Sequence, residues 1–136
     1  MEKSKQTAED VPKGVEFRRD EDFFTGYANN AYFEGTIWDL KIYFGQTDIV
    51  QGPNVVVQHT AITLPWNYAK IFCYVLQTQI AAREAEDGRI SVPKHIVPVP
   101  PSELPKEAAN LKHPKEGLEA IQKLWKEFVA ANPELE

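Results

Sequence analysis

"TIWDLKIYFG", residues 36–45, is the stretch that decides the fold. Along it Trp38, Leu40, Ile42 and Phe44 alternate with Ile37, Asp39, Lys41 and Tyr43. Successive side chains of a strand point to opposite faces, so this period of two predicts a strand with one wholly apolar face and one mixed face. The carboxylate on the mixed face, that of Asp39, is the first candidate for chemistry.

Neighbouring segments predict further strands. NAYFEG (30–35) precedes the first stretch and is expected to join it at the Glu34–Gly35 turn. VVVQHTAITL (55–64) is rich in β-branched residues and predicts a third strand. VEFRR (15–19) is a candidate for a short edge strand. Connections this short do not allow parallel crossovers, so we expect an antiparallel meander of three or four strands.

A long helix is expected over WNYAKIFCYVLQTQIAAREAED (66–87), with Thr63 as its cap, Pro65 in its first turn and Gly88 after its end. One apolar stripe has the spacing of a core-facing side and contains Ala69, Phe72, Cys73, Leu76 and Ile80. A second stripe contains Tyr68, Ile71, Val75 and Ala82, with Tyr74 beside it. One sheet covers only one side of a helix, so the second stripe requires another cover.

The predicted fold class is α+β: an antiparallel three- to four-stranded meander packed against a long helix, plus a C-terminal amphipathic helix after a proline-rich arm. Four segments follow from the composition along the chain. They are a flexible polar leader (1–13), an α+β core domain (14–91), a proline-rich extended connector (92–113) and a C-terminal helix (114–132).

Charge is distributed unevenly along the 136 residues, whose formal net charge is −5. Residues 23–80 contain few charged side chains: Glu34, Asp39, Lys41, Asp48 and Lys70. An acidic chain with scattered basic residues lacks the electrostatic footprint of a nucleic-acid binder, so we expect no nucleic-acid partner. The sequence contains neither a secretory leader nor an apolar run long enough to span a membrane, and these features predict a cytoplasmic protein.

Two interpretations of Asp39 stay open. On a covered face its pKa would rise and it would act in proton transfer; on a partly solvated face Lys41 or a cross-strand polar group would satisfy it. No second carboxylate is placed by the sequence to complete an acid–base pair. Asp39 is therefore a weak catalytic candidate.

Other chemistry has little support. His59, His95 and His113 are too far apart in the sequence for the closely spaced pair of a zinc site, so no metal site and no cofactor are expected. His59 is expected to be a half-buried strand residue. Cys73 lies on the core-facing stripe, where cysteine behaves as a small hydrophobe. PVPP (98–101) has no flanking basic residue and fits a linker, although a regulatory adaptor presenting this arm is a third hypothesis.

The chain resembles an uncharacterised bacterial family, number 3467 in the series of domains of unknown function, over about residues 25–91. The resemblance rests on Tyr27-Ala28-Asn29, Trp38-Asp39, Phe44-Gly45, the helix start from Pro65 to Lys70, and the helix end from Glu84 to Ile90, which departs from the family spacing. It implies a compact module and little chemistry. The order of an antiparallel sheet followed by long helices is also similar to export chaperones of the SecB type, as an analogy of architecture.

Two functional hypotheses follow. The first is a non-catalytic protein-binding or assembly module that forms a homodimer or higher oligomer and also contacts other polypeptides. A chaperone-like role is one version of this hypothesis. Its candidate binding residues are Tyr32, Trp38, Tyr43, Trp66, Tyr68, Ile71 and Tyr74. The second is a small enzyme or ligand-binding domain with a pocket between sheet and helix that uses Asp39 and His59. If the C-terminal helix covers the second stripe within the same chain, a monomer is the alternative to the oligomer.

Overall fold

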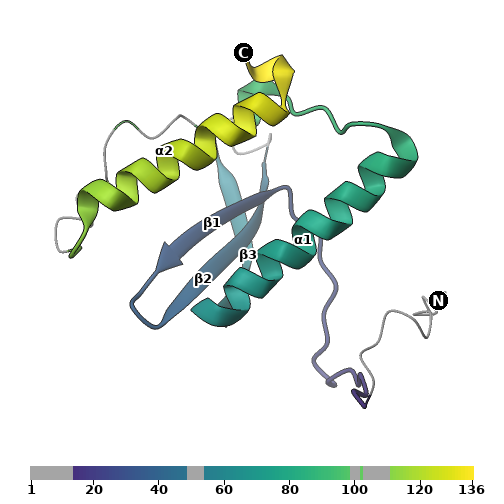
Figure 1. The fold of residues 1–136 in the computed structure, drawn as a ribbon. Coiled ribbons are helices and arrows are strands. Elements are labelled where there is room, and N and C mark those ends of the chain that lie inside the picture. Colours follow the sequence, from purple (N-terminus) through teal and green to yellow (C-terminus); the bar gives the residue numbers. More distant parts are fainter. Residues whose placement is uncertain (1–13, 49–53, 99–101, 103–110) are drawn as a thin grey trace. The chain divides into compact units, whose positions relative to one another are not determined.

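The computed structural model describes residues 14–48, 54–98, 102 and 111–136. The chain divides into two compact units, Met1–Ile71 and Phe72–Glu136. Its elements follow the order β1, β2, β3, α1, η1, α2 and η3 (Figure 1). The fold class is α+β, as predicted: a three-stranded antiparallel sheet contacts a long helix, and a second helix lies near the C-terminus. The predicted leader (1–13) lies outside the described residues, and the four predicted segment boundaries stay predictions.

The sheet is a meander of three strands in the order β1-β2-β3. Its strands are β1 (Asn30–Gly35), β2 (Asp39–Thr47) and β3 (Val56–Pro65). Both pairings are antiparallel, which confirms the prediction. The candidate edge strand over residues 15–19 is not present, because that segment has no strand pairing.

The pairing register gives the sheet one apolar face and one mixed face. Ile42 is opposite Phe33 on one side and Ile62 on the other, and paired residues share a face. The apolar face consists of Ala31 and Phe33 from β1, Leu40, Ile42 and Phe44 from β2, and Ile62 and Leu64 from β3. Among the described residues, Ile42 is the buried hydrophobic side chain, with 3% exposure.

The first turn lies later in the sequence than predicted. Gly35 is the last residue of β1 and pairs with Leu40. The residues that connect the two strands are therefore Thr36 to Trp38. Trp38 therefore lies in the turn with 78% of its surface exposed and is not on the apolar face. The Thr36 side chain accounts for this difference, because its hydroxyl accepts backbone hydrogen bonds from Trp38 and Asp39.

A bulge interrupts the pairing of β2 with β3. Phe44 pairs with Thr60 while Gly45 pairs with Gln58, so His59 is an extra residue on β3. Gly45 is buried, and a Cβ atom at this position would lie 2.6 Å from the carbonyl oxygen of Val57. A glycine is needed here because the two backbones approach closely at the bulge.

The long helix α1 (Trp66–Asp87) has the predicted bounds. The predicted cap is wrong, because Thr63 and Pro65 both belong to β3 and the helix begins directly after the strand. Its predicted end is confirmed. Gly88 has a positive φ of +87°, and its N–H donates to the carbonyl of Glu84 at 2.9 Å.

The sheet contacts the first residue of α1. The indole Nε1 of Trp66 donates a hydrogen bond to the carbonyl of Thr36 at 2.8 Å. The same ring lies against Gly35, where an added Cβ would be 3.0 Å from a ring carbon. Trp66 thus anchors the start of the helix to the turn between β1 and β2.

The second unit contains the end of α1, η1 (Lys94–Ile96), α2 (Pro114–Ala131) and η3 (Pro133–Leu135). The start of α2 is the predicted one, with Pro114 in its first turn, and its end lies one residue before the predicted limit. Pro93 and Val97, on either side of η1, have extended φ and ψ values, as expected for a proline-rich connector.

Candidate functional site

The Asp39 side chain takes part in the hydrogen bonds of the β1–β2 turn. Its carboxylate oxygen Oδ1 accepts a hydrogen bond of 2.9 Å from the Thr36 hydroxyl. The same hydroxyl oxygen accepts the N–H groups of Trp38 and Asp39, each at 3.1 Å. Asp39 therefore shares a network that shapes the turn, and among the described contacts none joins its carboxylate to Lys41. The geometry assigns it a role in holding the turn.

The mixed face of the sheet carries a chain of aromatic and charged contacts. The rings of Tyr32 and Tyr43 lie 6.1 Å apart, and the Tyr43 hydroxyl donates to Glu34 at 3.0 Å. The Lys41 ammonium lies 5.6 Å from the centre of the Tyr43 ring. These groups satisfy one another across β1 and β2, and Tyr43 is half-buried as a result.

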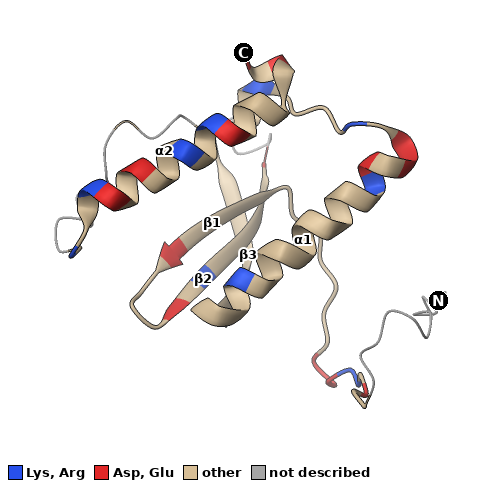
Figure 2. Ribbon diagram, viewed as in Figure 1, with Lys and Arg blue, Asp and Glu red and all other residues tan. Residues whose placement is uncertain are grey.

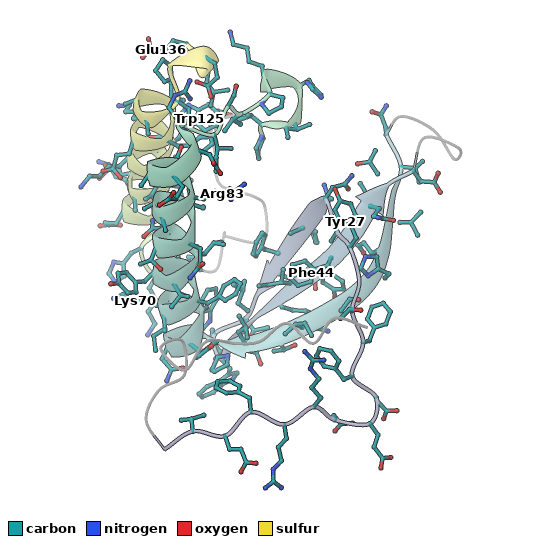
Figure 3. All side chains as sticks on the ribbon, turned by 90° about the vertical axis from the view of Figure 1, so that its right-hand side faces the viewer. Tyr27, Phe44, Lys70, Arg83, Trp125 and Glu136 are labelled. Carbon is teal, nitrogen blue, oxygen red and sulfur yellow. The ribbon has the colours of Figure 1, made fainter. Side chains whose placement is uncertain are left out.

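A hollow of about 200 Å³ lies on the apolar face at the bulge. Its lining comes from the sheet and from residues 24–28, which we call the strap; the lining residues are Phe24, Gly26, Ala28, Phe44, His59, Thr60 and Ile62. Tyr27 of the strap and Phe44 of β2 are labelled in Figure 3. The strap leads into β1, and Asn29 donates its N–H to the carbonyl of Gly45 at 3.0 Å.

His59 attaches the strap to β3. Its Nε2 lies 2.8 Å from the carbonyl oxygen of Tyr27, and its Nδ1 lies 2.8 Å from the Thr60 hydroxyl. A carbonyl oxygen only accepts, so Nε2 carries a proton and donates it to Tyr27. The expectation of a half-buried strand residue is wrong: His59 is exposed, as are Val57 and Gln58 before it, because β3 is an edge strand of the sheet.

The middle of α1 is an uncharged surface. Between Lys70 and Arg83, both labelled in Figure 3, the helix carries no charged residue, and Figure 2 shows this part of the ribbon without blue or red. No residue of α1 is buried. Ile71 is 53% exposed, Tyr74 66% and Leu76 50%. We call residues 71–82 the uncharged segment of α1.

The core-facing assignment of one α1 stripe is wrong at Cys73, which is exposed together with Phe72, Leu76 and Ile80. Only Ala69 of that stripe is half-buried. The periodicity in the sequence marks apolar positions but does not supply the element that covers them. Both predicted stripes of α1 therefore present apolar side chains at the surface.

The predicted binding residues lie on β1, on β2, in the turn between these strands and on α1. Tyr32 and Tyr43 meet on the mixed face, while Trp38 projects from the turn. Trp66 is used in anchoring α1, whereas the last three residues lie further along that helix: Tyr68, Ile71 and Tyr74. Apart from Tyr43, each of the seven is exposed.

The second unit contains an ionic clasp that the sequence does not signal. Nη1 of Arg89 donates to both carboxylate oxygens of Glu134, at 2.8 and 2.6 Å. The backbone N–H of Val92 donates to the same carboxylate at 2.8 Å. These hydrogen bonds from Arg89 and then from Val92 lower the pKa of Glu134 from 4.5 to about 2.

Within the described ranges no three His, Cys, Asp or Glu side chains gather as metal ligands would. In the same part of the chain, neither helix combines the length and hydropathy that crossing a membrane requires. His95 and His113 lie in η1 and directly before α2, away from His59 in the sequence.

Comparison with known proteins places the chain in a family. The family model described as Protein of unknown function (DUF3467) matches residues 1–92, a longer stretch than the residues that carry the resemblance in the sequence. No curated protein and no solved structure matches the chain.

Proposed function

We propose that this chain, which belongs to the family described as Protein of unknown function (DUF3467), is a non-catalytic protein-binding or assembly module. It associates with itself, as a homodimer or higher oligomer, through apolar surface on its sheet and helix. The observation that carries this proposal is the uncharged segment of α1, which has no buried residue.

The energetic argument concerns apolar area. Burying one side chain the size of leucine or phenylalanine contributes about 1.5–3 kcal/mol. The uncharged segment exposes several of them at once, including Phe72 at 41%, Val75 at 45% and Ile80 at 43%. Twelve helical residues extend roughly 18 Å, so covering them supplies a large part of the ~800 Å² per partner of a stable interface.

A chaperone-like role is one version of this proposal. The exposed aromatic rings of Tyr32, Trp38 and Tyr74 would receive apolar side chains of extended polypeptide segments. Binding of a chemically unfolded polypeptide, with no binding of its folded form, supports this version. Self-association without such binding leaves an assembly role alone.

The experiment compares two glutamate variants in the same helix. Val75→Glu places a charge among apolar side chains, whereas Gln77→Glu places the same charge at a position that is already polar. Native mass spectrometry is expected to show an oligomer for the wild-type chain and for Gln77→Glu, and a monomer for Val75→Glu. A monomeric wild-type chain that binds neither a hydrophobic dye nor unfolded polypeptide contradicts the proposal.

The alternative, an enzyme or ligand-binding domain that uses Asp39, gains no specific support from the described contacts. The Asp39 carboxylate accepts from Thr36, and the hollow on the apolar face is lined by His59 but not by Asp39, so the two residues of this alternative do not share a site. Asp39→Asn keeps an oxygen acceptor for Thr36. Loss of a measurable ligand in this variant, with unchanged unfolding, would restore the alternative.

A further inference from the structure

The sheet has two edges with different chemistry. β1 is six residues long and carries Glu34, whose carboxylate binds the Tyr43 hydroxyl. β3 is ten residues long and contains no charged residue. Charged side chains and short length are two common ways in which proteins protect a sheet edge from pairing with another strand. β1 has both of these forms of protection, whereas β3 has neither of the two, and its other protective features, a bulge and a proline, lie outside residues 60–64.

Among the described residues, β3 has no strand partner on its outer side. Its strand hydrogen bonds run to β2, its one neighbour in the sheet. Among the described residues, none of the backbone hydrogen bonds of turns and loops involves residues 56–65. The strap reaches this strand through the side chain of His59 rather than through a backbone bond.

Two features limit the regular part of this edge. The bulge at His59 interrupts it on one side, and Pro65, which has no N–H to donate, ends it on the other. Between them lie five residues with regular pairing to β2, from Thr60 to Leu64. Their midpoint is Ile62, which is 46% exposed although its neighbour Ile42 is 3% exposed.

We propose that β3 pairs with β3 of a second copy of this chain, antiparallel and about a two-fold axis at Ile62, to form a continuous six-stranded sheet. This inference rests on the self-association proposed above and identifies one of its surfaces. A two-fold axis normal to the sheet keeps the apolar faces of both copies on the same side, so each residue is opposite a residue of its own face.

The resulting register suits a second copy. Ile62 lies opposite Ile62, and Thr60 lies opposite Leu64, all on the apolar face. Ala61 lies opposite Thr63 on the mixed face. Every facing pair is uncharged and most members are β-branched, which favours cross-strand contact and avoids the repulsion of like charges across the axis.

The test uses cysteine cross-linking in a Cys73→Ser background, because Cys73 is the chain's one cysteine. Residues directly opposite in an antiparallel pair have Cα atoms about 4.5–5.5 Å apart, within the range that a disulfide spans. Ile62→Cys is therefore expected to give a covalent dimer on mild oxidation. Phe33→Cys is the matched control, because Phe33 pairs with Ile42 from the opposite edge and on the same face.

Cross-linking of Ile62→Cys without cross-linking of Phe33→Cys supports the proposal. A chain that is oligomeric in native mass spectrometry but does not cross-link through Ile62→Cys overturns the β3 pairing and leaves self-association intact. A wild-type chain that is monomeric overturns the β3 pairing, and one that also binds neither a hydrophobic dye nor unfolded polypeptide overturns both proposals.

A charge variant gives an independent measurement. Ile62→Lys places two ammonium groups against each other at the axis, and we expect the Kd of self-association to rise roughly 100-fold. Phe33→Lys adds the same charge at the other edge and is expected to leave the Kd within a few-fold of the wild-type value. Equal effects of the two variants overturn the β3 pairing; far-ultraviolet circular dichroism confirms that each variant is folded.

Discussion

The Thr36 hydroxyl holds the β1–β2 turn by accepting two backbone N–H groups and donating to the Asp39 carboxylate. Thr36→Val removes all of these bonds at similar volume, and we expect a loss of about 1–2 kcal/mol in the free energy of unfolding. Asp39→Asn retains an acceptor for the hydroxyl, so its effect is expected to stay within about 0.5 kcal/mol. Urea unfolding of both variants tests this order. A larger loss in Asp39→Asn would contradict the turn-holding role.

Glu134 makes the stability of the folded chain depend on pH. Its pKa of about 2 lies below the ordinary 4.5, since Arg89 and the Val92 N–H stabilise its charged form. A carboxyl with a lowered folded-state pKa stabilises fully above pH 4.5, and this contribution is lost as the pH falls toward 2. We expect Glu134→Gln to melt below the wild-type chain at pH 6, with a difference that shrinks as the pH falls below 4.5 and vanishes only below about pH 2. A difference that does not shrink below pH 4.5 would contradict this account.

At the scale of the element, replacing two glycines of the second unit by alanine is expected to change the free energy of unfolding in opposite directions. Gly88 ends α1 with a φ of +87°, so Gly88→Ala forces a side chain into a left-handed conformation and is expected to cost about 1 kcal/mol. Gly117 lies inside α2 with open space where a Cβ would be, so Gly117→Ala is expected to gain about 0.5–1 kcal/mol. Thermal unfolding of the two variants measures both signs, and a gain in Gly88→Ala would contradict the assignment of the helix end.

The same scale explains what the sequence predicts well. Alternation in residues 36–45 predicts β2, β-branched residues predict β3, and Gly88 marks the end of α1, because each signal is local. The turn at Thr36 escaped prediction because several local hydrogen-bond patterns compete for one short segment. The bulge at His59 was not predicted, because one extra residue does not alter the β-branched composition that marks β3 as a strand.

The candidate site was harder to predict than the fold. Asp39 was correctly located in β2, but its partner Thr36 fixes its role, and that partner lies outside the alternating pattern of the strand. Arg89 and Glu134 are 45 residues apart, and no spacing rule connects them. His59 contacts the carbonyl of Tyr27, which lies 32 residues earlier in the sequence, so no local pattern indicates this contact. The uncharged segment of α1 was visible in the sequence; its lack of cover was not.

At the scale of the whole molecule, self-association predicts that stability depends on concentration. Unfolding of a dimer releases two chains, so a tenfold increase in protein concentration favours the folded dimer by about 1.4 kcal/mol. For two chains of 136 residues this corresponds to a rise in Tm of roughly 2 °C. Calorimetry over a hundredfold concentration range measures the shift. A constant Tm in Val75→Glu alongside a rising wild-type Tm would tie the effect to α1.

The exposed thiol of Cys73 has a practical consequence. It is the chain's one sulfhydryl, and it lies within the uncharged segment of α1. A polarity-sensitive fluorophore attached there reports on this helix without any substitution in the protein. Its emission moves to the blue when a second polypeptide excludes water from the label and stays red-shifted while the helix is hydrated. The fluorescence of a label on the Cys73 sulfur therefore reports in real time whether another polypeptide covers the uncharged segment of α1.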